Sequence, residues 1–477
     1  MKARSDRYDL VVLGGGTAGL VSSMIAAGAD ARVALIERER TGGDCLWTGC
    51  VPSKSLIAAA GLAHRMRHAN AVGLEPVEPQ IDFERVMEHV SGAIATIAPH
   101  DSPERLRAAG VEVIEAHGRF VGPGRIEAGG RTLRWRTAIV ATGSRPVVPP
   151  LDGLAQVGPL TTDTVWSLRE LPQRLVVLGG GPVGCELAQA FARLGSRVTL
   201  VEVADRLLAG EEPRTSALIA ERLRGEGIDL RLGARSAAVR PGELLLDGGA
   251  SVAFDRMLVA AGRTPRTHDL GLDSVGVRVD ERGHVVADDR LRTSGPGIFA
   301  AGDVTGRPAF THVAGHHARI ATSNALFHTR SRVAPTIPRV TFTDPEIARV
   351  GLSEAQARER WGDEAQIAQF DYARSDRAIT AGQAYGFAKL VADPRGRLVG
   401  ATVAAPGGGE AIAELTVWVS QGARIDAVSR SVHAYPTLAE GPARAADEHV
   451  AARYSSPRVR AAARPLLAIL RAVERPR

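Results

Sequence analysis

The sequence predicts an α/β protein in which one βαβ unit occurs twice and a segment of a different pattern follows. Three observations indicate this fold class. An apolar strand runs into a glycine-rich loop at residues 9–19, the same arrangement returns at residues 175–184, and the strand and helix pattern changes after residue 336. A repeated unit of this size indicates similarly folded copies in one chain. The length of 477 residues is sufficient for two or three domains with their own cores.

The first copy begins with an apolar strand at residues 9–13, which leads into a glycine loop that opens a helix. A second strand, residues 32–36, ends in Glu37. In this order the backbone N–H groups and the helix dipole face a pyrophosphate, and the acid accepts hydrogen bonds from a ribose. The sequence therefore predicts a dinucleotide site here, and the glycines of its loop are Gly14, Gly16 and Gly19.

The second copy repeats the first with the same offsets. The strand at residues 175–178 precedes the glycine loop, and the strand at residues 198–201 ends in Glu202. Two copies imply two bound nucleotides, one in each. The second loop contains Gly179, Gly181 and Gly184. Each copy closes with a similar strand and turn, at residues 138–146 and 257–265, and these turns contain Thr142, Gly143 and Gly262.

Two of the three cysteines, Cys45 and Cys50, lie just behind the first glycine loop. Four intervening residues can form one turn that brings the Cα atoms to a bridging distance of roughly 4.4–6.8 Å. An apolar stretch after Cys50 predicts a helix with Pro52 in its first turn, so the positive helix end lowers the pKa of the Cys50 thiol. A redox pair is favoured over two unrelated buried cysteines or half a zinc site, because zinc needs four ligands.

From about residue 8 to about residue 452, these motifs resemble the class I FAD-dependent pyridine nucleotide-disulfide oxidoreductases. Residues 186–196 and 340–345 are most similar to mercuric reductase, and the chain is also similar to lipoamide dehydrogenase. The resemblance implies two Rossmann-like dinucleotide-binding domains, the first for FAD and the second for NAD(P)H, plus an α+β C-terminal dimerisation domain. It therefore implies a homodimer. It also implies that Asp303, in the run 297–303, holds the ribityl chain of FAD.

The same resemblance assigns roles around the cysteines. Cys50 is the thiolate next to the flavin, and Cys45 is the interchange thiol that attacks the substrate. Lys54 and Glu186 match positions that form an ion pair beside the flavin, where a positive charge stabilises the reduced flavin and the thiolate. A solvated helix lysine and an ordinary helix glutamate are the alternatives. The third cysteine, Cys185, is expected to be a small buried hydrophobe.

The run of residues 433–440 departs from the family pattern. Many members carry a histidine that acts as acid and base, whereas this chain has Tyr435 there and retains the following Glu440. Tyrosine, with a pKa near 10, is a poor proton acceptor at pH 7, and loss of a positioned base costs on the order of 10²–10⁴ in rate. His433 can replace it only from the same side of the chain, which two-residue spacing permits. A structural or surface histidine is the alternative.

These features predict an NAD(P)H-dependent, FAD-containing disulfide oxidoreductase with an unidentified small electron acceptor. A mercuric or other metal-ion reductase is an alternative, although the C-terminal cysteine pair of that group is missing, because no cysteine follows Cys185. A flavin-binding redox sensor or docking subunit is the third hypothesis. Glu202 favours NADH over NADPH because a carboxylate repels a 2′-phosphate, whereas the nearby Arg206 argues for NADPH.

Composition restricts the partners and the location. The net charge is +6, but basic residues alternate with acids along most of the chain, so no nucleic-acid partner is expected. No run of apolar residues is long enough to span a membrane. Basic N-terminal residues lead straight into the first strand, which argues against a cleavable signal. A working disulfide fits a reducing compartment, so we expect a cytoplasmic protein, and no metal site is expected.

The expected domain boundaries follow from the repeat. We expect the FAD domain at residues 1–150, the NAD(P)H domain at 151–270, the returning part of the FAD domain at 271–335, the dimerisation domain at 336–455 and a basic tail at 456–477. Apolar tail residues recur at helical spacing with the arginines largely off their face, which is typical of a short helix on an anionic membrane surface. We favour the alternatives, a helix packed on the enzyme's own surface or a frayed terminus.

Overall fold

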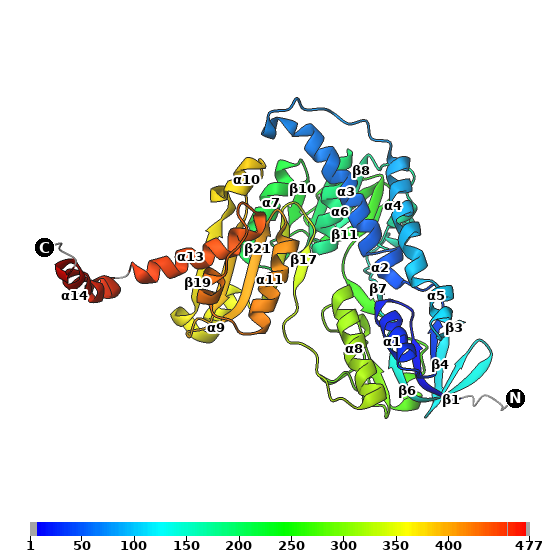
Figure 1. Cartoon of the computed structure of the whole chain (residues 1–477). Helices are drawn as coiled ribbons and strands as arrows, with labels where there is room; N and C mark the ends of the chain where they lie inside the picture. The colour runs from blue at the N-terminus through cyan, green and yellow to red at the C-terminus, as the bar shows by residue number, and fades with distance from the viewer. Residues whose placement is uncertain (1–6, 456, 474–477) are drawn as a thin grey trace. The chain divides into compact units, whose positions relative to one another are not determined.

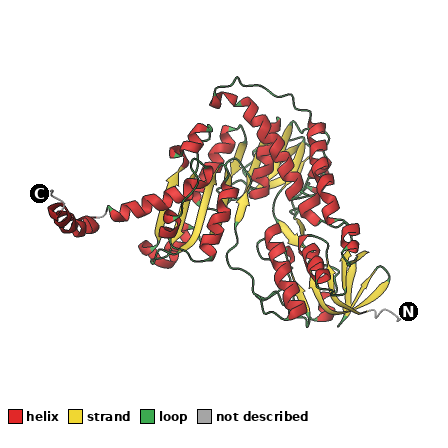
Figure 2. Cartoon of the chain, viewed as in Figure 1, coloured by secondary structure: helices red, strands yellow, loops and turns green. Residues whose placement is uncertain are grey.

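The computed structural model describes residues 7–455 and 457–473 (Figure 1). Residue 456 and residues 474–477 of the expected tail lie outside the described residues. The described chain forms two compact units, each with helices and strands (Figure 2). The first unit consists of residues 7–67, Glu78–Asp205 and Glu226–Ala334. The second consists of His68–Val77, Arg206–Gly225 and the described residues from Pro335 onward.

The first unit is built on a mixed sheet in the order β3-β2-β1-β6-β5-β4, with β16 pairing with β6. Strands β3, β2, β1, β6 and β16 are parallel, whereas β5 and β4 are added antiparallel. The strands are β1 (Arg7–Leu13), β2 (Val33–Glu37), β3 (Glu112–Glu115), β4 (Gly118–Gly122), β5 (Arg125–Ala128), β6 (Arg131–Val140) and β16 (Ile298–Ala300).

Side-chain alternation gives this sheet two buried faces. On β1, Leu10 and Val12 join a core with helices α1 (Thr17–Gly28) and α8 (Thr311–Phe327). The other face of β1, with Val11 and Leu13, belongs to a separate core that includes β4, β5 and β6. Because both faces are covered, the central strands are continuous apolar runs, as expected for parallel strands.

The second copy of the repeat lies in the same unit. Its parallel sheet has the order β10-β9-β8-β14 and packs against α6 (Pro182–Leu194). The other strands of the unit pair antiparallel, in the order β11-β12-β13 and between β7 and β15. The strands are β7 (Ser144–Pro146), β8 (Arg174–Leu178), β9 (Arg197–Glu202), β10 (Asp229–Leu232), β11 (Ser236–Arg240), β12 (Glu243–Leu246), β13 (Ser251–Ala253), β14 (Arg256–Val259) and β15 (Arg263–Pro265).

Four helices follow β2, and the first two carry the cysteine pair. They are α2 (Gly43–Trp47), α3 (Cys50–Arg67), α4 (Phe83–Ile97) and α5 (Pro103–Ala108). Cys50 is the first residue of α3 and Pro52 lies in its first turn, as the sequence predicts. Short 3₁₀ turns connect many elements of the chain: Ala69–Val72, Ala98–Asp101, Ala155–Val157, Val165–Ser167, Leu272–Val275, Asp303–Thr305, Gly362–Glu364, Tyr372–Arg374 and Leu438–Glu440.

The second unit has an antiparallel sheet in the order β17-β18-β21-β20-β19. Helices α11 and α13 share one core with this sheet, and α9 packs against β20. The strands are β17 (Arg339–Thr341), β18 (Glu346–Gly351), β19 (Gln366–Asp371), β20 (Phe387–Ala392) and β21 (Leu398–Ala405). The helices are α7 (Pro213–Gly225), α9 (Glu354–Trp361), α10 (Asp376–Thr380), α11 (Gly408–Ser420), α12 (Ile425–Arg430), α13 (Gly441–Tyr454) and α14 (Pro457–Val473).

The predicted tail helix is present as α14, which continues through Pro465. Five of its apolar side chains are exposed: Val459, Leu466, Leu467, Ile469 and Leu470. Of the two favoured alternatives, packing of this helix on the enzyme's own surface is therefore not observed for these residues. Across residues 7–455 and 457–473, no helix combines the length and the apolar character that a membrane span requires.

Candidate active site

The cysteine pair lies in the first unit, where α2 ends and α3 begins. Cys45 lies in α2 and is half-buried, and Cys50 opens α3 and is exposed. Both are free thiols, and a side-chain hydrogen bond joins them. The two cysteines predicted as a redox pair therefore lie within hydrogen-bonding distance of each other at this junction.

The Cys50 sulfur lies at the N-terminal ends of two helices. It belongs to the first residue of α3, and it lies 3.3 Å from the hydroxyl of Thr311, the first residue of α8. The pKa of Cys50 is lowered to about 6, chiefly by the hydrogen bond from Cys45, with smaller contributions from Thr311 and the Lys54 charge. The same bond raises the pKa of Cys45. Cys50 is therefore the thiolate of the pair, and Cys45 keeps its proton.

Lys54 and Glu186 form an ion pair one turn beyond Cys50. The Lys54 Nζ lies 2.8 Å from Glu186 Oε2, and it also donates a hydrogen bond of 3.3 Å to the Ser53 hydroxyl. The Glu186 side chain, from α6, is 8% exposed, whereas that of Lys54 is 36% exposed. A buried carboxylate requires a partner of this kind, so neither residue is an ordinary solvated helix residue.

The two predicted ribose-binding acids have the same contacts. The Glu37 carboxylate accepts hydrogen bonds from the backbone N–H of Gly15, at 2.6 Å, and from that of Glu39. The Glu202 carboxylate accepts equivalent hydrogen bonds from the backbone N–H of Gly180, at 2.5 Å, and from that of Ala204. The repeat therefore extends from the sequence to the hydrogen bonds that join each acid to its glycine loop.

The first glycine of each loop is required by a close approach of the backbone. Gly14 has φ +100°, and a Cβ there would lie 2.4 Å from the Ala141 carbonyl oxygen. Gly179 has φ +111°, and its Cβ would lie 2.5 Å from the Ala260 oxygen. Only glycine fits these positions. The other glycines of the two loops lie at the starts of α1 and α6: Gly16, Gly19, Gly181 and Gly184.

A pocket of about 300 Å³ opens beside the first loop, within the first unit. Its lining includes Gly14, Glu37, His117, Thr142 and Arg266. The Thr142 hydroxyl donates to the Arg266 carbonyl oxygen at 2.6 Å, which joins the closing turns of the two copies at this pocket. A glycine loop, a ribose-binding acid and an adjacent cavity fit the nucleotide part of FAD.

Asp303 is the end of a polar chain that reaches the cysteine loop. Its Oδ2 accepts a 2.7 Å hydrogen bond from the Ser144 hydroxyl, which in turn accepts one of 2.7 Å from Arg263. Arg263 also pairs with Asp44, and Arg266 lies 3.7 Å from the same carboxylate. Burial raises the pKa of Asp44, and the two arginines oppose that effect. The two glycines predicted in the closing turns, Gly143 and Gly262, have positive φ and directly precede Ser144 and Arg263.

His317 is a buried residue of α8 that the sequence analysis missed. It is 2% exposed, and its Nδ1 accepts a 3.2 Å hydrogen bond from the backbone N–H of Gly302, next to Asp303. Burial lowers the pKa of His317 to about 4, so the ring is neutral at pH 7. A histidine within an apolar helix that follows the 297–303 motif was the signal available for it.

Tyr435 and Glu440 lie in the second unit. Tyr435 is 66% exposed, and its hydroxyl donates a 2.5 Å hydrogen bond to Asp376, which raises the pKa of Tyr435. Glu440 is 6% exposed, and burial raises its pKa. The phenol is therefore held by Asp376, a residue for which the sequence offered no motif.

His433 is directed to a different helix. Its Nε2 lies 3.0 Å from Glu414 of α11, and its Nδ1 lies 2.9 Å from the Ser431 carbonyl oxygen. The Trp418 indole donates to the same Glu414 oxygen. Tyr435, in contrast, is bonded to Asp376 of α10. The two candidate acid-base residues thus have separate sets of partners.

Cys185 stands apart from the redox pair. It is fully buried in α6, its thiol donates to the Gly180 carbonyl oxygen at 3.3 Å, and burial raises its pKa. It therefore has the environment of a small hydrophobe.

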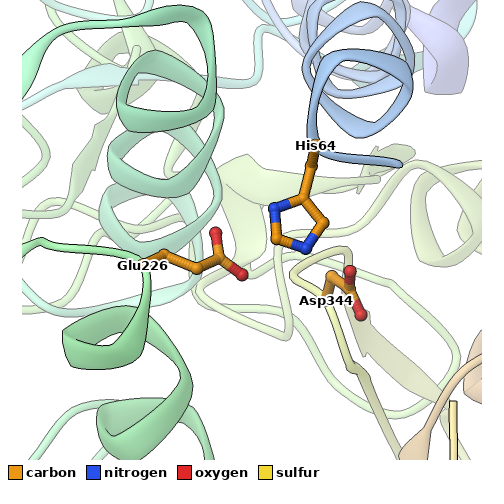
Figure 3. A group of neighbouring side chains, drawn as sticks. All are labelled: His64, Glu226 and Asp344. Carbon is orange, nitrogen blue, oxygen red and sulfur yellow. The ribbon is translucent and has the colours of Figure 1, made fainter. Parts of the chain in front are cut away.

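Figure 3 shows two potential metal ligands of the first unit, His64 and Glu226, together with Asp344 of the second unit. Glu226 forms a buried ion pair with Arg193 at 2.6 Å. Asp344 accepts a 2.7 Å hydrogen bond from the hydroxyl of Tyr385 within the second unit. These carboxylates have protein partners, and we assign no metal to them.

The comparisons with known sequences cover nearly the whole chain. The family described as "Pyridine nucleotide-disulphide oxidoreductase" matches residues 8–318, and its dimerisation domain matches residues 337–446. A mercuric reductase of Streptomyces lividans is 38% identical over 448 residues, which are 91% of this chain and 94% of the relative. A dihydrolipoyl dehydrogenase of Thermus scotoductus is 36% identical over 465 residues, which are 92% and 97%.

Solved structures agree with this result. LpdA from Mycobacterium tuberculosis has a TM-score of 0.84 and 29% identity, and the match covers 93% of this chain and 99% of that one. The HOCl-induced flavoprotein disulfide reductase RclA from Escherichia coli has a TM-score of 0.82 and 28% identity, with 92% and 99% covered. The predicted fold class is confirmed.

Proposed function

Because the chain belongs to the pyridine nucleotide-disulphide oxidoreductase family, we propose that Cys45 and Cys50 are its redox-active pair. The predicted enzyme class and cofactors are confirmed at the family level: the protein is an NAD(P)H-dependent, FAD-containing oxidoreductase with a dimerisation domain. One observation carries the proposal. The Cys50 thiol lies among Cys45, Thr311 and Lys54, all of which lower its pKa.

The proposed cofactor residues follow the two copies of the repeat. FAD, when bound, accepts a hydride from NAD(P)H and passes the electron pair to the cysteine pair. We assign FAD to Gly14, Gly16, Gly19, Glu37, Thr142, Gly143 and Asp303, and NAD(P)H to Gly179, Gly181, Gly184, Glu202 and Gly262. We assign the FAD domain to residues 1–150 and 271–335, the NAD(P)H domain to residues 151–270 and the dimerisation domain to residues 336–455.

The chemistry of the thiols follows from their protonation. Once its proton is removed, Cys45 attacks one sulfur of an acceptor disulfide, which forms a mixed disulfide and releases the first product thiol. The Cys50 thiolate then attacks the Cys45 sulfur, which restores the Cys45–Cys50 disulfide and releases the second thiol. The acceptor gains two electrons and two protons. The cysteine pair supplies both electrons and the proton of Cys45, and the second proton comes from the solvent, because Cys50 reacts as a thiolate. Lys54 stabilises the Cys50 thiolate throughout.

A base must remove the proton of Cys45. We propose that the enzyme is a homodimer and that Tyr435, Glu440 or His433 of one subunit serves the thiols of the other, as the family resemblance implies. Among these, Glu440 is the carboxyl group with a raised pKa, whereas the proton of Tyr435 is bonded to Asp376. This arrangement favours Glu440 as the proton carrier.

We further propose NADH as the preferred nucleotide, because the Glu202 carboxylate at the end of β9 would repel a 2′-phosphate. We also propose a cytoplasmic location, because a disulfide that works as a redox centre, and does not serve as a structural crosslink, fits a reducing compartment. NADPH with equal or better catalytic efficiency would contradict the first of these two proposals.

A metal-ion acceptor is the second candidate, and one observation favours it. The Streptomyces lividans relative is named mercuric reductase, and two adjacent thiols are suitable ligands for a soft cation. No third cysteine is available nearby, since Cys185 is buried in α6.

A substrate panel tests these proposals. NADH oxidation is measured with lipoamide, glutathione disulfide, Hg(II), quinones and oxygen, for the wild type, Cys50→Ser and Cys45→Ser. We expect a disulfide acceptor to be reduced by the wild type and by neither variant. Reduction of Hg(II) alone would support the second candidate. A Cys50→Ser enzyme as active as the wild type would overturn the assignment of the pair, and a fully active monomer in sedimentation would overturn the cross-subunit assignment.

A further inference from the structure

Helix α14 presents an uncovered apolar face at the end of the second unit. The exposed fractions of Leu466, Ile469 and Leu470 are 60%, 61% and 46%. Their spacing of three and four residues puts them on one side of the helix. Figure 1 draws α14 as a separate helix beyond α13. The match to the dimerisation domain ends at residue 446, before α14 begins.

The other side of α14 carries three arginines together with the exposed Leu467. Arg460, Arg464 and Arg471 follow one another at four and seven residues, so they share a face opposite to the apolar one. Asp and Glu do not occur between Pro457 and Val473. An exposed apolar stripe whose opposite face carries arginines and no acid is the composition of a helix that lies in the plane of an anionic lipid surface.

We propose that α14 docks the enzyme on an anionic phospholipid surface. The leucine and isoleucine side chains enter the boundary of the acyl chains, and the arginines remain at the level of the phosphate groups, where their long aliphatic stems allow the charged ends to stay in water. The charge of the helix commits the proposal to anionic lipid, since a zwitterionic surface offers no net attraction to the arginines. A single short helix supports reversible attachment, which leaves the enzyme free in part.

The experiment uses the full-length holoenzyme and sedimentation with vesicles of phosphatidylglycerol or of phosphatidylcholine. We expect the wild type to sediment with phosphatidylglycerol only, and the sedimented fraction to fall as salt is added. Leu466→Glu/Ile469→Glu removes two buried apolar side chains from the contact and should weaken binding by roughly tenfold or more.

The matched control is Ala468→Glu, which adds a negative charge on the arginine face. It should weaken binding only about fivefold, because the apolar face is intact and a single charge is worth about 1 kcal/mol at such a surface. FAD content and NADH oxidation should be the same in all variants, since α14 belongs to neither cysteine site nor cofactor loop.

Two results would overturn the proposal. One is undiminished binding of Leu466→Glu/Ile469→Glu to phosphatidylglycerol, which would assign the attachment to another surface. The other is the absence of wild-type binding. If the same variant also converts a dimer into monomers in sedimentation velocity runs without vesicles, the apolar face belongs to a second copy of the chain instead.

Discussion

The sulfur of Cys50 lies 3.3 Å from the hydroxyl oxygen of Thr311, although 261 positions separate the two residues in the sequence. Thr311 opens α8, and Cys50 opens α3. A hydroxyl donor and the N-terminal ends of two helices thus act on one thiol. Each of these stabilises the thiolate more than the thiol.

Thr311→Val should raise the pKa of Cys50, because the thiolate loses a hydrogen bond from a neutral donor. A hydrogen bond to a charged group is worth about 1.5–3 kcal/mol, so the thiolate fraction at pH 5 should fall by roughly 10- to 100-fold. The measurement is the rate of iodoacetamide alkylation of Cys50 against pH, which for the wild type should have its midpoint at about 6. Thr311→Ser keeps the hydroxyl and should retain the wild-type profile; an unchanged profile in the valine variant would contradict the assignment.

Cys45 makes the largest contribution to the acidity of Cys50, and this gives a second prediction. Cys45→Ala should shift the alkylation profile of Cys50 further to high pH than Thr311→Val does. Cys45→Ser, which can still donate a hydrogen bond, should shift it less and should still abolish turnover with a disulfide acceptor. Equal profiles for the alanine and serine variants would mean that the hydrogen bond between the thiols is not the cause.

Lys54→Met leaves the Glu186 carboxylate, only 8% exposed, without its 2.8 Å partner. We expect a loss of about 1–3 kcal/mol in the free energy of unfolding, the cost of removing a charged hydrogen-bond partner from a buried carboxylate, and the exposure of Lys54 moderates the effect. Lys54→Met/Glu186→Leu should recover most of that loss, because the buried carboxylate is removed together with its partner. Urea unfolding of the single and double variants provides the measurement, and additive losses would argue against coupling of the two residues.

His317 predicts a dependence of stability on pH. Its pKa in the folded protein is about 4, below the ordinary value of 6.5, so between these values the unfolded chain binds a proton that the folded chain does not. The contribution of His317 to the free energy of unfolding is therefore complete above pH 6.5. As the pH drops toward 4, this contribution falls by on the order of 3 kcal/mol. His317→Gln should flatten the profile of urea unfolding over this range. A slope equal to that of the wild type would contradict the prediction.

Tyr435→His should restore an imidazole beside Asp376. A histidine with a carboxylate partner is a far better proton acceptor at pH 7 than tyrosine, and a positioned base typically contributes about 10²-fold or more. We expect dihydrolipoamide oxidation to rise in the histidine variant and to change little in Tyr435→Phe. The paired assay of both variants decides, since no increase with histidine would show that position 435 does not reach the thiols of a partner subunit.

The repeat was predictable because its signals are local. Strand, glycine loop, helix and acid lie within one βαβ unit, and the contacts of Glu37 and Glu202 with Gly15 and Gly180 confirm the equivalence of the two copies. The start of α3 at Cys50 was equally local, since Pro52 and the apolar run after it are sufficient to predict a helix there. The Lys54–Glu186 contact depended on family resemblance, because no local rule relates α3 to α6.

The other contacts of the site could not be predicted, because they join segments that are distant in the sequence. Thr311 acts on Cys50 only because α8 and α3 converge, and no periodicity in the sequence encodes that approach. Asp376 and Tyr435 meet in the same way across the second unit. For α14, spacing predicted the helix, but whether anything covers its apolar face depends on the whole fold.

The series of polar contacts from Asp44 through Arg263 and Ser144 to Asp303 has a consequence for how this protein can be altered. Ser144 and Arg263 come from the closing turns of the two copies, whose strands β7 and β15 also pair with each other. The two repeats can therefore not be exchanged independently. A chimera whose foreign second unit lacks both Arg263 and Arg266 would leave the Asp44 carboxylate without these two counter-charges. Such an exchange would disturb the cysteine loop without touching a cysteine, so grafting has to treat both closing turns and the loop as one part.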